Sequence, residues 1–397
     1  MSARRLESVI LTDLKKKMVM LAGPRQCGKT TLAKSIANKS QLSWAYYNWD
    51  IDADRRLIMK SELDAASQLW VLDELHKFGK WRNWLKGQFD QHHPKRSFLV
   101  TGSAKLETYS RGGDSLQGRY FLHRLHPFTL AEIIHPKKVL PWQEAMQCSL
   151  SVPASAQNTL MDLFKLGGFP EPLFSQSERE ASRWRLAYGS RVVRDEIRSL
   201  EQVKNLDGME LLLDRLPATI GSVLSINSLR EDLQVAFETA RNWLMIFERL
   251  YAILRVAPYG PPRIKAAKKE QKLYFWDWRR VENEAARFEN LVAIHLLRFV
   301  HWQEDVEGEK WELRYFRDKQ KHEVDFILLH KEKPVCAIEV KTDESSLDSN
   351  LKYLLERVKI PYAFQISLKG TKDWQPQPIN GCQIRVMPAA RFLAQLM

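Results

Sequence analysis

The sequence has few cysteines and no long apolar run. Its four cysteines, at positions 27, 148, 336 and 382, form no CxxC pair, so we expect neither a structural zinc site nor a disulfide framework. No stretch of about 18 uncharged apolar residues occurs, and a membrane span is therefore not expected. The opening 17 residues contain no apolar segment long enough for a signal peptide. The expected location is the cytoplasm.

Apolar residues are not lacking overall. They make up 44% of the 397 residues and charged residues 27%, which is typical of a globular protein and excludes a mainly disordered chain. At roughly 100–200 residues per domain, this length predicts two or three domains. Anions are the scarcer charge, with 48 Asp and Glu against 61 Lys and Arg, giving a net charge of +13. This excess favours a polyanionic partner such as nucleic acid, and the alternative is an ordinary soluble surface.

Short apolar strands alternate with helices in the first third of the chain. The strands are expected at 17–23, 44–50, 68–74 and 97–103. Strands that alternate with helices predict an α/β fold, in which a parallel sheet is covered on both faces. We divide the chain into a phosphate-loop nucleotide domain over 1–135, a helical junction over 136–204, a winged helix-turn-helix over 205–281 and an α/β domain over 282–397.

The strongest motif is a phosphate-binding loop. Gly23-Pro24-Arg25-Gln26-Cys27-Gly28-Lys29-Thr30 fits GxxxxGK[ST], with an apolar strand before it and a helix expected after it at 31–39. Glycines allow backbone amides to close around phosphate oxygens at the start of a helix. Lys29 is expected to reach the β- and γ-phosphates, and the Thr30 hydroxyl to bind Mg²⁺. The expected cofactors are ATP and Mg²⁺, and Thr31 completes the set of nucleotide-binding residues.

Three further features of the first domain fit ATP hydrolysis. The strand over 68–74 ends in Asp73, expected to hold Mg²⁺, and Glu74, expected to polarise the attacking water. A polar residue at the end of the next strand, Thr101 or Ser103, is a candidate sensor of the γ-phosphate. Arg119 follows that strand and is a candidate arginine finger, acting on its own or on a neighbouring subunit. The alternative for Arg119 is an ordinary surface arginine.

These motifs occur in an order that resembles a known family. GPRQCGKTTL, YYNWD, VLDELHK, LVTGSA, LQGRY and LHPFTLAE follow one another, and GGFPEP comes later. This series is similar to bacterial and archaeal AAA-superfamily ATPases whose C-terminal region is a domain of unknown function. The resemblance covers nearly the whole chain. His76 departs from the pattern, because the family commonly has a glutamine there.

The middle segment has the helix, helix, helix, β-hairpin order of a winged helix-turn-helix. Eight cations and two anions lie between positions 255 and 280, a net charge of +6 in a short stretch. Phosphate contacts made by such cations dominate non-specific binding to DNA. The alternative is a solvated face or a winged helix that contacts protein. The expected DNA-binding residues are Arg241, Arg263, Lys265, Lys268, Lys269 and Lys272.

The C-terminal segment carries the pattern of a PD-(D/E)xK nuclease. Asp325 lies in one expected strand, and thirteen residues separate it from Glu339, which is followed two residues later by Lys341. Residues two apart in a strand share a face, so Glu339 and Lys341 point the same way. The carboxylates are expected to hold Mg²⁺, with Glu289 as an additional ligand, while Lys341 acts on the hydrolytic water. The alternative is a domain of this fold that binds but does not cut.

Together these features predict an ATPase that binds and processes DNA. Two alternatives stay open: a DNA remodelling or branch-migration motor without cleavage, and a nucleotide-dependent regulatory switch that binds a protein partner. AAA-type sites often lie between subunits, which is compatible with a homo-oligomer.

Overall fold

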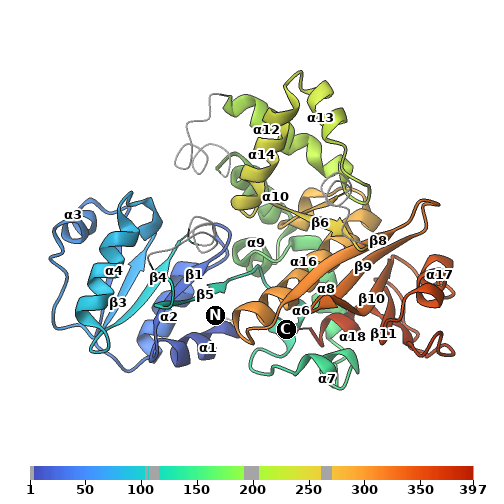
Figure 1. Ribbon diagram of the computed structural model, residues 1–397, viewed down its shortest axis with the longest axis horizontal. Helices are drawn as coiled ribbons and strands as arrows, with labels where there is room; N and C mark the ends of the chain where they lie inside the picture. Colours follow the sequence, from blue (N-terminus) through green and yellow to red (C-terminus); the bar gives the residue numbers. More distant parts are fainter. Residues whose placement is uncertain (1–3, 103–105, 107–115, 192–204, 261–270, 397) are drawn as a thin grey trace. The chain divides into compact units, whose positions relative to one another are not determined.

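A computed structural model describes residues 4–102, 106, 116–191, 205–260 and 271–396 (Figure 1). The chain divides into two compact units. The first consists of Met1–Pro127 with Arg249–Tyr251, and the second of Phe128–Glu248 with Ala252–Met397. In the described parts of the chain, no helix combines the length and the apolar character that crossing a membrane requires.

The first unit is built on a parallel sheet of five strands in the order β2-β3-β4-β1-β5, and the α/β expectation for it is confirmed. β1 and β3 are buried along their whole length, as expected for strands covered on both faces. The sequence analysis did not anticipate β5. The strands are β1 (Met18–Ala22), β2 (Trp44–Asn48), β3 (Leu69–Asp73), β4 (Ser97–Thr101) and β5 (Tyr120–Arg124).

α1 precedes β1, and helical segments connect β1 to β2, β2 to β3 and β3 to β4. Since all the strands run the same way, their carboxyl ends lie along one edge of the sheet, where the phosphate loop follows β1. The helical elements are α1 (Leu6–Asp13), α2 (Lys29–Lys39), α3 (Asp52–Lys60), η1 (Leu75–Lys77) and α4 (Trp81–His92).

The second unit contains a mixed sheet of seven strands in the order β12-β11-β10-β9-β8-β6-β7. β8, β9 and β10 are antiparallel neighbours, while β10, β11 and β12 run parallel. Its strands are β6 (Ile253–Pro258), β7 (Lys272–Phe275), β8 (Trp311–Arg317), β9 (Glu323–His330), β10 (Lys333–Lys341), β11 (Tyr362–Ser367) and β12 (Gln383–Pro388).

The hairpin of β6 and β7 belongs to this sheet. Its two strands pair antiparallel, and β6 also pairs with β8 through Ala257 and Pro258. The sequence analysis divides the chain at position 281, between the hairpin and the C-terminal strands, whereas in the structure the hairpin extends their sheet. The long helix α16 (Glu284–Asp305) packs against β7, β8 and β10 (Figure 1), and its buried residues lie between Phe288 and Gln303.

The other helical elements of this unit precede the hairpin or follow β10, except η5, which follows β7 directly. Three of them, α12, α13 and α14, come directly before β6 in the order expected of a helix-turn-helix. The helices are α6 (Leu130–Ile134), α7 (Trp142–Met146), α8 (Ala156–Leu166), α9 (Pro170–Ser175), α10 (Glu178–Arg191), α12 (Leu206–Arg215), η4 (Leu216–Thr219), α13 (Ile226–Asp232), α14 (Phe237–Arg249), η5 (Trp278–Arg280), α17 (Ser349–Arg357) and α18 (Ala389–Leu393).

Candidate functional sites

The phosphate loop connects β1 to α2, and its first and last glycines have left-handed backbone angles. Gly23 has a φ of 147°, and a Cβ atom there would lie 2.4 Å from the carbonyl oxygen of Leu125. Gly28 has a φ of 98° and precedes the first residue of α2. Both positions therefore require glycine. Lys29 is buried inside the loop, where its Nζ donates to the carbonyl oxygens of Gly23 at 3.0 Å and Pro24 at 2.8 Å.

Asp73 is the centre of a hydrogen-bond network beside this loop. Its Oδ2 accepts from the Thr30 hydroxyl at 2.8 Å and from the Tyr46 hydroxyl at 2.6 Å. Its Oδ1 accepts from the Thr101 hydroxyl. Burial and the Asp73 carboxylate raise the pKa of Tyr46, which keeps this phenol a donor. The structure thus brings together Thr30, Asp73 and Thr101, which the sequence analysis singled out, and adds Tyr46, which it missed.

Glu74 follows Asp73 in a left-handed conformation, with a φ of 55°. Its carboxylate lies 3.3 Å from Lys77 Nζ and 3.8 Å from His76 Nε2. His76 is buried, and its Nδ1 atom lies 2.7 Å from the point where a Cβ on Gly102 would be. The unusual histidine therefore packs between the ends of β3 and β4. Ser103, the second candidate sensor, lies outside the described residues.

Arg119 does not lie near the phosphate loop of its own chain. Its guanidinium forms a two-point ion pair with Asp90 of α4, with distances of 2.7 and 3.1 Å. Its carbonyl oxygen accepts from the amide of Met18, at the start of β1. The loop follows the other end of this five-residue strand, about 16 Å away at the rise of an extended strand. Arg119 as an arginine finger within its own subunit is therefore wrong. Arg124 instead pairs with Ala22 at the loop edge of the sheet.

Asp325, Glu339 and Lys341 come together in the second unit. The register that pairs Phe326 with Ile338 places Asp325 of β9 beside Glu339 of β10. Asp325 Oδ2 accepts from the amide of Val340 at 2.9 Å. Lys341 Nζ donates to Glu339 Oε1 at 2.7 Å and lies 2.9 Å from Asp348 Oδ2. We call Asp325, Glu339 and Lys341 the carboxylate–lysine site.

Burial dominates the electrostatics of this site. It raises the pKa of Glu339 to about 7, although Lys341 acts in the opposite direction. Burial, followed by repulsion from Glu339 and Glu289, raises the pKa of Asp325 well above its usual range. The Oε2 atom of Glu339 is buried and has no hydrogen-bond partner among the described residues. The unpaired Oε2 atom of Glu339 lies among carboxylates that repel one another, and this arrangement favours the binding of a proton or a cation there.

The surroundings of Lys272 contradict its predicted role in DNA binding and bear on the predicted role of Glu289 as a metal ligand. Its side chain is only 1% exposed, and its Nζ lies 3.0 Å from Glu289, 2.6 Å from Glu323 and 3.6 Å from Asp325. Burial alone would lower its pKa, but Glu289, Asp325 and Glu323 hold the pKa above its ordinary value. Lys272 is therefore an internal counter-ion, and its assignment to an exposed DNA-binding wing is wrong. Glu289 Oε1 is held by Lys272 and by the Tyr274 hydroxyl at 2.6 Å, so this oxygen is already engaged in bonds within the protein.

The remaining pair, Asp325 and Glu339, suits a magnesium ion by chemistry. Both supply hard oxygen donors, and the unpaired Oε2 of Glu339 is available. Mg²⁺ is usually held by one or two carboxylates together with waters and substrate phosphates. Within the described residues, no group of three or more His, Cys, Asp or Glu side chains is arranged to hold a metal ion. The fit therefore rests on two protein carboxylates, without the third that the sequence suggested.

Of the other residues expected to bind DNA, the structure describes only Arg241. Arg241 lies on α14 with its side chain 48% exposed and ion-paired to Glu238 at 2.9 Å. Arg263, Lys265, Lys268 and Lys269 lie outside the described residues.

A large cavity adjoins the carboxylate–lysine site. Its volume is about 1560 Å³, and Asp325, Glu339 and Lys341 form part of its lining. Four arginines, Arg185, Arg279, Arg280 and Arg287, also line it. The sequence analysis missed this group because its members come from α10, η5 and α16 and form no motif.

The raised pKa of Glu339 predicts a dependence of stability on pH. Between its ordinary pKa of 4.5 and about 7, the folded chain keeps a proton that the unfolded chain releases. Its contribution to the free energy of unfolding therefore falls as pH rises through this window. Glu339→Gln should lose much less stability than the unmodified protein between pH 5 and pH 7, measured by urea unfolding. Glu356→Gln, on the exposed face of α17, is the control, and equal slopes for all three proteins would contradict the assignment.

The first unit matches a class of nucleotide-dependent proteins. Residues 15–134, which contain the five-stranded parallel sheet, match the family model of the AAA domain. The expected AAA resemblance is confirmed over this range. Two further models match the rest of the chain, a domain of unknown function over residues 157–278 and another over 284–392.

Individual relatives are distant. An uncharacterized protein of Mycobacterium tuberculosis is 24% identical over 260 residues, covering 66% of this chain and 54% of its own length. This chain thus spans about half the length of that relative. An uncharacterized protein of Methanocaldococcus jannaschii is 23% identical over 392 residues, covering 87% of this chain and 79% of the relative.

Two solved structures were also found by comparison. The RuvB Holliday junction branch migration motor of Thermotoga maritima is 19% identical, with 63% of this chain and 87% of that chain covered and a TM-score of 0.28. The ORC1 protein of Aeropyrum pernix, in complex with DNA, is 15% identical, with coverages of 73% and 90% and a TM-score of 0.30.

Proposed function

We propose that this protein is an ATP-hydrolysing enzyme that binds DNA and cuts its phosphodiester bonds at the carboxylate–lysine site. ATP hydrolysis is supported chiefly by the bond between Thr30 and Asp73, which joins the phosphate loop to the acidic end of β3. DNA cleavage is supported by a buried carboxylate, a partly buried carboxylate and a lysine that line the same cavity as the arginines.

In the first unit, each residue has a distinct task toward the nucleotide. The amides of the loop and the Lys29 ammonium bind the phosphates, while Thr30 and Asp73 hold Mg²⁺, which neutralises phosphate charge when bound. Tyr46 and Thr101 fix the Asp73 carboxylate through their hydroxyls. Glu74 accepts a hydrogen bond from the attacking water and increases its nucleophilicity. Lys77 Nζ forms an ion pair with the Glu74 carboxylate at 3.3 Å.

In the second unit, the order α16, β8, β9, β10, α17, β11 supports a nuclease-like core, with the acidic strands adjacent at its centre. Asp325 and Glu339 would hold Mg²⁺, which lowers the pKa of a bound water and polarises the phosphate when present. Lys341, ion-paired with Glu339 and Asp348, stabilises negative charge that develops at the attacked phosphate. ATP turnover in the first unit would change the arrangement of the protein around DNA.

One observation favours a second candidate, a DNA-binding ATPase without cleavage. Lys272 already supplies a positive charge to Glu289, Glu323 and Asp325. An internal ammonium can replace a metal ion as the charge that stabilises clustered carboxylates. A remodelling motor or a nucleotide-dependent switch would retain such a site as structure only.

A cleavage assay separates these candidates. The full-length protein is expected to cut one or more of duplex, forked, four-way and single-stranded DNA in Mg²⁺ or Mn²⁺, with or without ATP. Asp325→Ala, Glu339→Ala and Lys341→Ala should each lower cleavage by about 100-fold or more while ATP turnover stays measurable. Glu356→Ala is the matched control on α17. If the unmodified protein cuts none of these substrates under any nucleotide condition, cleavage is abandoned in favour of the second candidate.

A further inference from the structure

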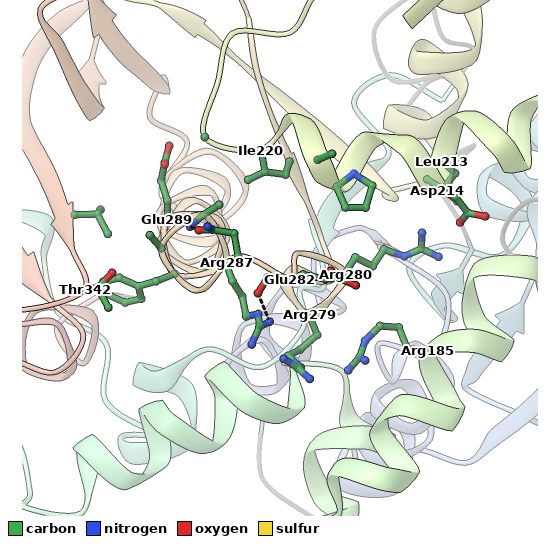
Figure 2. Close-up of a pocket in the computed structure, with 18 of the residues that line it drawn as sticks. Arg185, Leu213, Asp214, Ile220, Arg279, Arg280, Glu282, Arg287, Glu289 and Thr342 are labelled. Carbon is green, nitrogen blue, oxygen red and sulfur yellow. Dashed lines mark hydrogen bonds between the residues drawn. The ribbon is translucent and has the colours of Figure 1, made fainter. Parts of the chain in front are cut away.

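Four arginines line the cavity together with six acidic residues, yet three of the four form no ion pair with a carboxylate among the described residues. Arg185 comes from α10, Arg279 and Arg280 from η5, and Arg287 from α16. Figure 2 shows the side chains of Arg185, Arg279 and Arg287 converging, while that of Arg280 extends toward Asp214. We call them the arginine cluster.

The contacts of the cluster are mostly not with carboxylates. Arg185 Nε lies 3.5 Å from Asp277 Oδ2. Arg287 donates to the carbonyl oxygens of Val281 at 2.6 Å and Glu282 at 2.8 Å, and the second bond is drawn in Figure 2. Among the described residues, none of Arg279, Arg280 and Arg287 ion-pairs with an acidic side chain.

Two guanidinium groups are also partly desolvated and only partly compensated by nearby acids. The Nε atoms of Arg185 and Arg279 are buried and lack a hydrogen-bond partner in the described structure. Burial, and then the charges of Arg287 and Arg185, lower the pKa of Arg279 to about 10 even though Asp277 and Glu178 act the other way. A buried donor without a hydrogen-bond acceptor and two like charges packed close together both cost free energy. Such an arrangement is retained most readily where a bound anion offsets the cost.

The chemistry of the cluster and the size of the cavity narrow the choice of anion. The planar fork of arginine donates two parallel hydrogen bonds to a phosphate or carboxylate. A volume of about 1560 Å³ exceeds the range of roughly 300–1,000 Å³ that is usual for small-molecule pockets. Four cations in a cavity of this size suit a run of phosphates better than a single small anion.

We propose that the arginine cluster binds the backbone phosphates of a nucleic-acid strand and guides the strand to the carboxylate–lysine site in the same cavity. This inference rests on the proposed function, since it names the part of the second unit that holds the DNA. It also gives that unit a phosphate-binding surface within the described residues, separate from the basic segment over 261–270.

The test measures binding in the absence of divalent metal, so that cleavage is not required. Fluorescence anisotropy with labelled single-stranded and duplex oligonucleotides is compared for the full-length protein and Arg279→Gln/Arg280→Gln. Affinity should fall about tenfold or more. The slope of log affinity against log salt concentration should become shallower by about 1.4 for single strands and 1.8 for duplex, corresponding to two lost phosphate contacts.

The control is Arg357→Gln/Arg391→Gln, which removes two exposed arginines of the same unit and should leave affinity and slope nearly unchanged. Arg280→Gln alone serves if the double variant fails to fold, as judged by its unfolding transition. If DNA binds equally well to the unmodified protein and to the folded cluster variant, the inference is overturned while DNA binding stands. If the unmodified protein binds no DNA, both the inference and the DNA part of the proposed function are overturned.

A competition experiment distinguishes a nucleic-acid strand from a small phosphorylated compound as the ligand of the arginine cluster. Inorganic pyrophosphate and ADP are titrated against DNA bound to Lys29→Ala, in which the phosphate loop is impaired. If pyrophosphate or ADP displaces DNA only at concentrations high enough to change the ionic strength, the result supports binding of a nucleic-acid strand by the cluster. Specific displacement at micromolar concentration would assign the cluster to a small phosphorylated ligand and overturn the proposal.

Discussion

Lys29→Ala is expected to lower ATP turnover by at least about 100-fold, the loss typical when one preorganised electrostatic group is removed. Lys29 is buried in the loop, with its Nζ held by the carbonyl oxygens of Gly23 and Pro24. Its charge therefore lies where the phosphates of a nucleotide would be bound, and an alanine leaves that charge unreplaced. Steady-state phosphate release and binding of a fluorescent nucleotide measure the effect.

A matched control lies on the same helix. Lys39, near the end of α2, has a side chain 55% exposed and ion-paired with Glu7, so Lys39→Ala should retain turnover within about twofold, as expected for a solvent-screened pair. Glu74→Gln provides a complementary variant, because it should bind ATP normally but hydrolyse it 100-fold or more slowly than the unmodified protein, within the usual contribution of about 10²–10⁴ from general-base catalysis. Normal turnover in Glu74→Gln would show that the water is polarised by another group.

Lys272→Met should lower the free energy of unfolding of the second unit by about 3–5 kcal/mol, the usual cost of removing one partner from a buried ion pair. Methionine fills much of the same volume, so the loss would come from charge. Without the buried ammonium, the partly buried carboxylates of Glu289, Glu323 and Asp325 are left to repel one another. Urea unfolding of the full-length protein, followed by tryptophan fluorescence, measures the change.

Lys310→Met is the control for Lys272→Met. Lys310 also pairs with two glutamates, Glu312 and Glu332, but its side chain is 58% exposed, so the loss should stay below about 1 kcal/mol. The difference between the two variants should shrink in acid, because protonated carboxylates no longer need a counter-ion. Equal, small losses for both variants would mean that Lys272 contributes little as a counter-ion.

The sequence was most informative where function imposes a local pattern. Gly23, Gly28, Lys29 and Thr30 belong to one local motif, and the hydrogen bond from Thr30 to Asp73 shows that these two residues lie side by side. The strands of the first sheet were anticipated except β5. Its sequence, Tyr-Phe-Leu-His-Arg, ends in polar residues and is only partly buried, so it lacks the apolar run by which the others were found.

Contacts between segments far apart in the chain could not be predicted from the sequence. Arg119 follows the sensor strand in sequence, but the strand that it begins runs parallel to β1 and leaves it at the wrong edge of the sheet. Lys272 stands in a basic stretch, and only the pairing of the hairpin with the C-terminal sheet reveals that it faces acids from α16 and β9. Tyr46 and the arginine cluster likewise depend on which elements pack together, which no spacing in the chain encodes.

The continuity of the seven-stranded sheet bears on how this protein can be dissected. A recombinant fragment that starts at residue 282 would discard β6 and β7, leave the edge of β8 without its partner and remove the counter-ion of three acids. Exposed strand edges promote aggregation. A fragment of the second unit would instead have to begin near Phe128, where that unit begins, so the gene segment useful for crystallisation is more than twice as long as the C-terminal family match at 284–392 suggests.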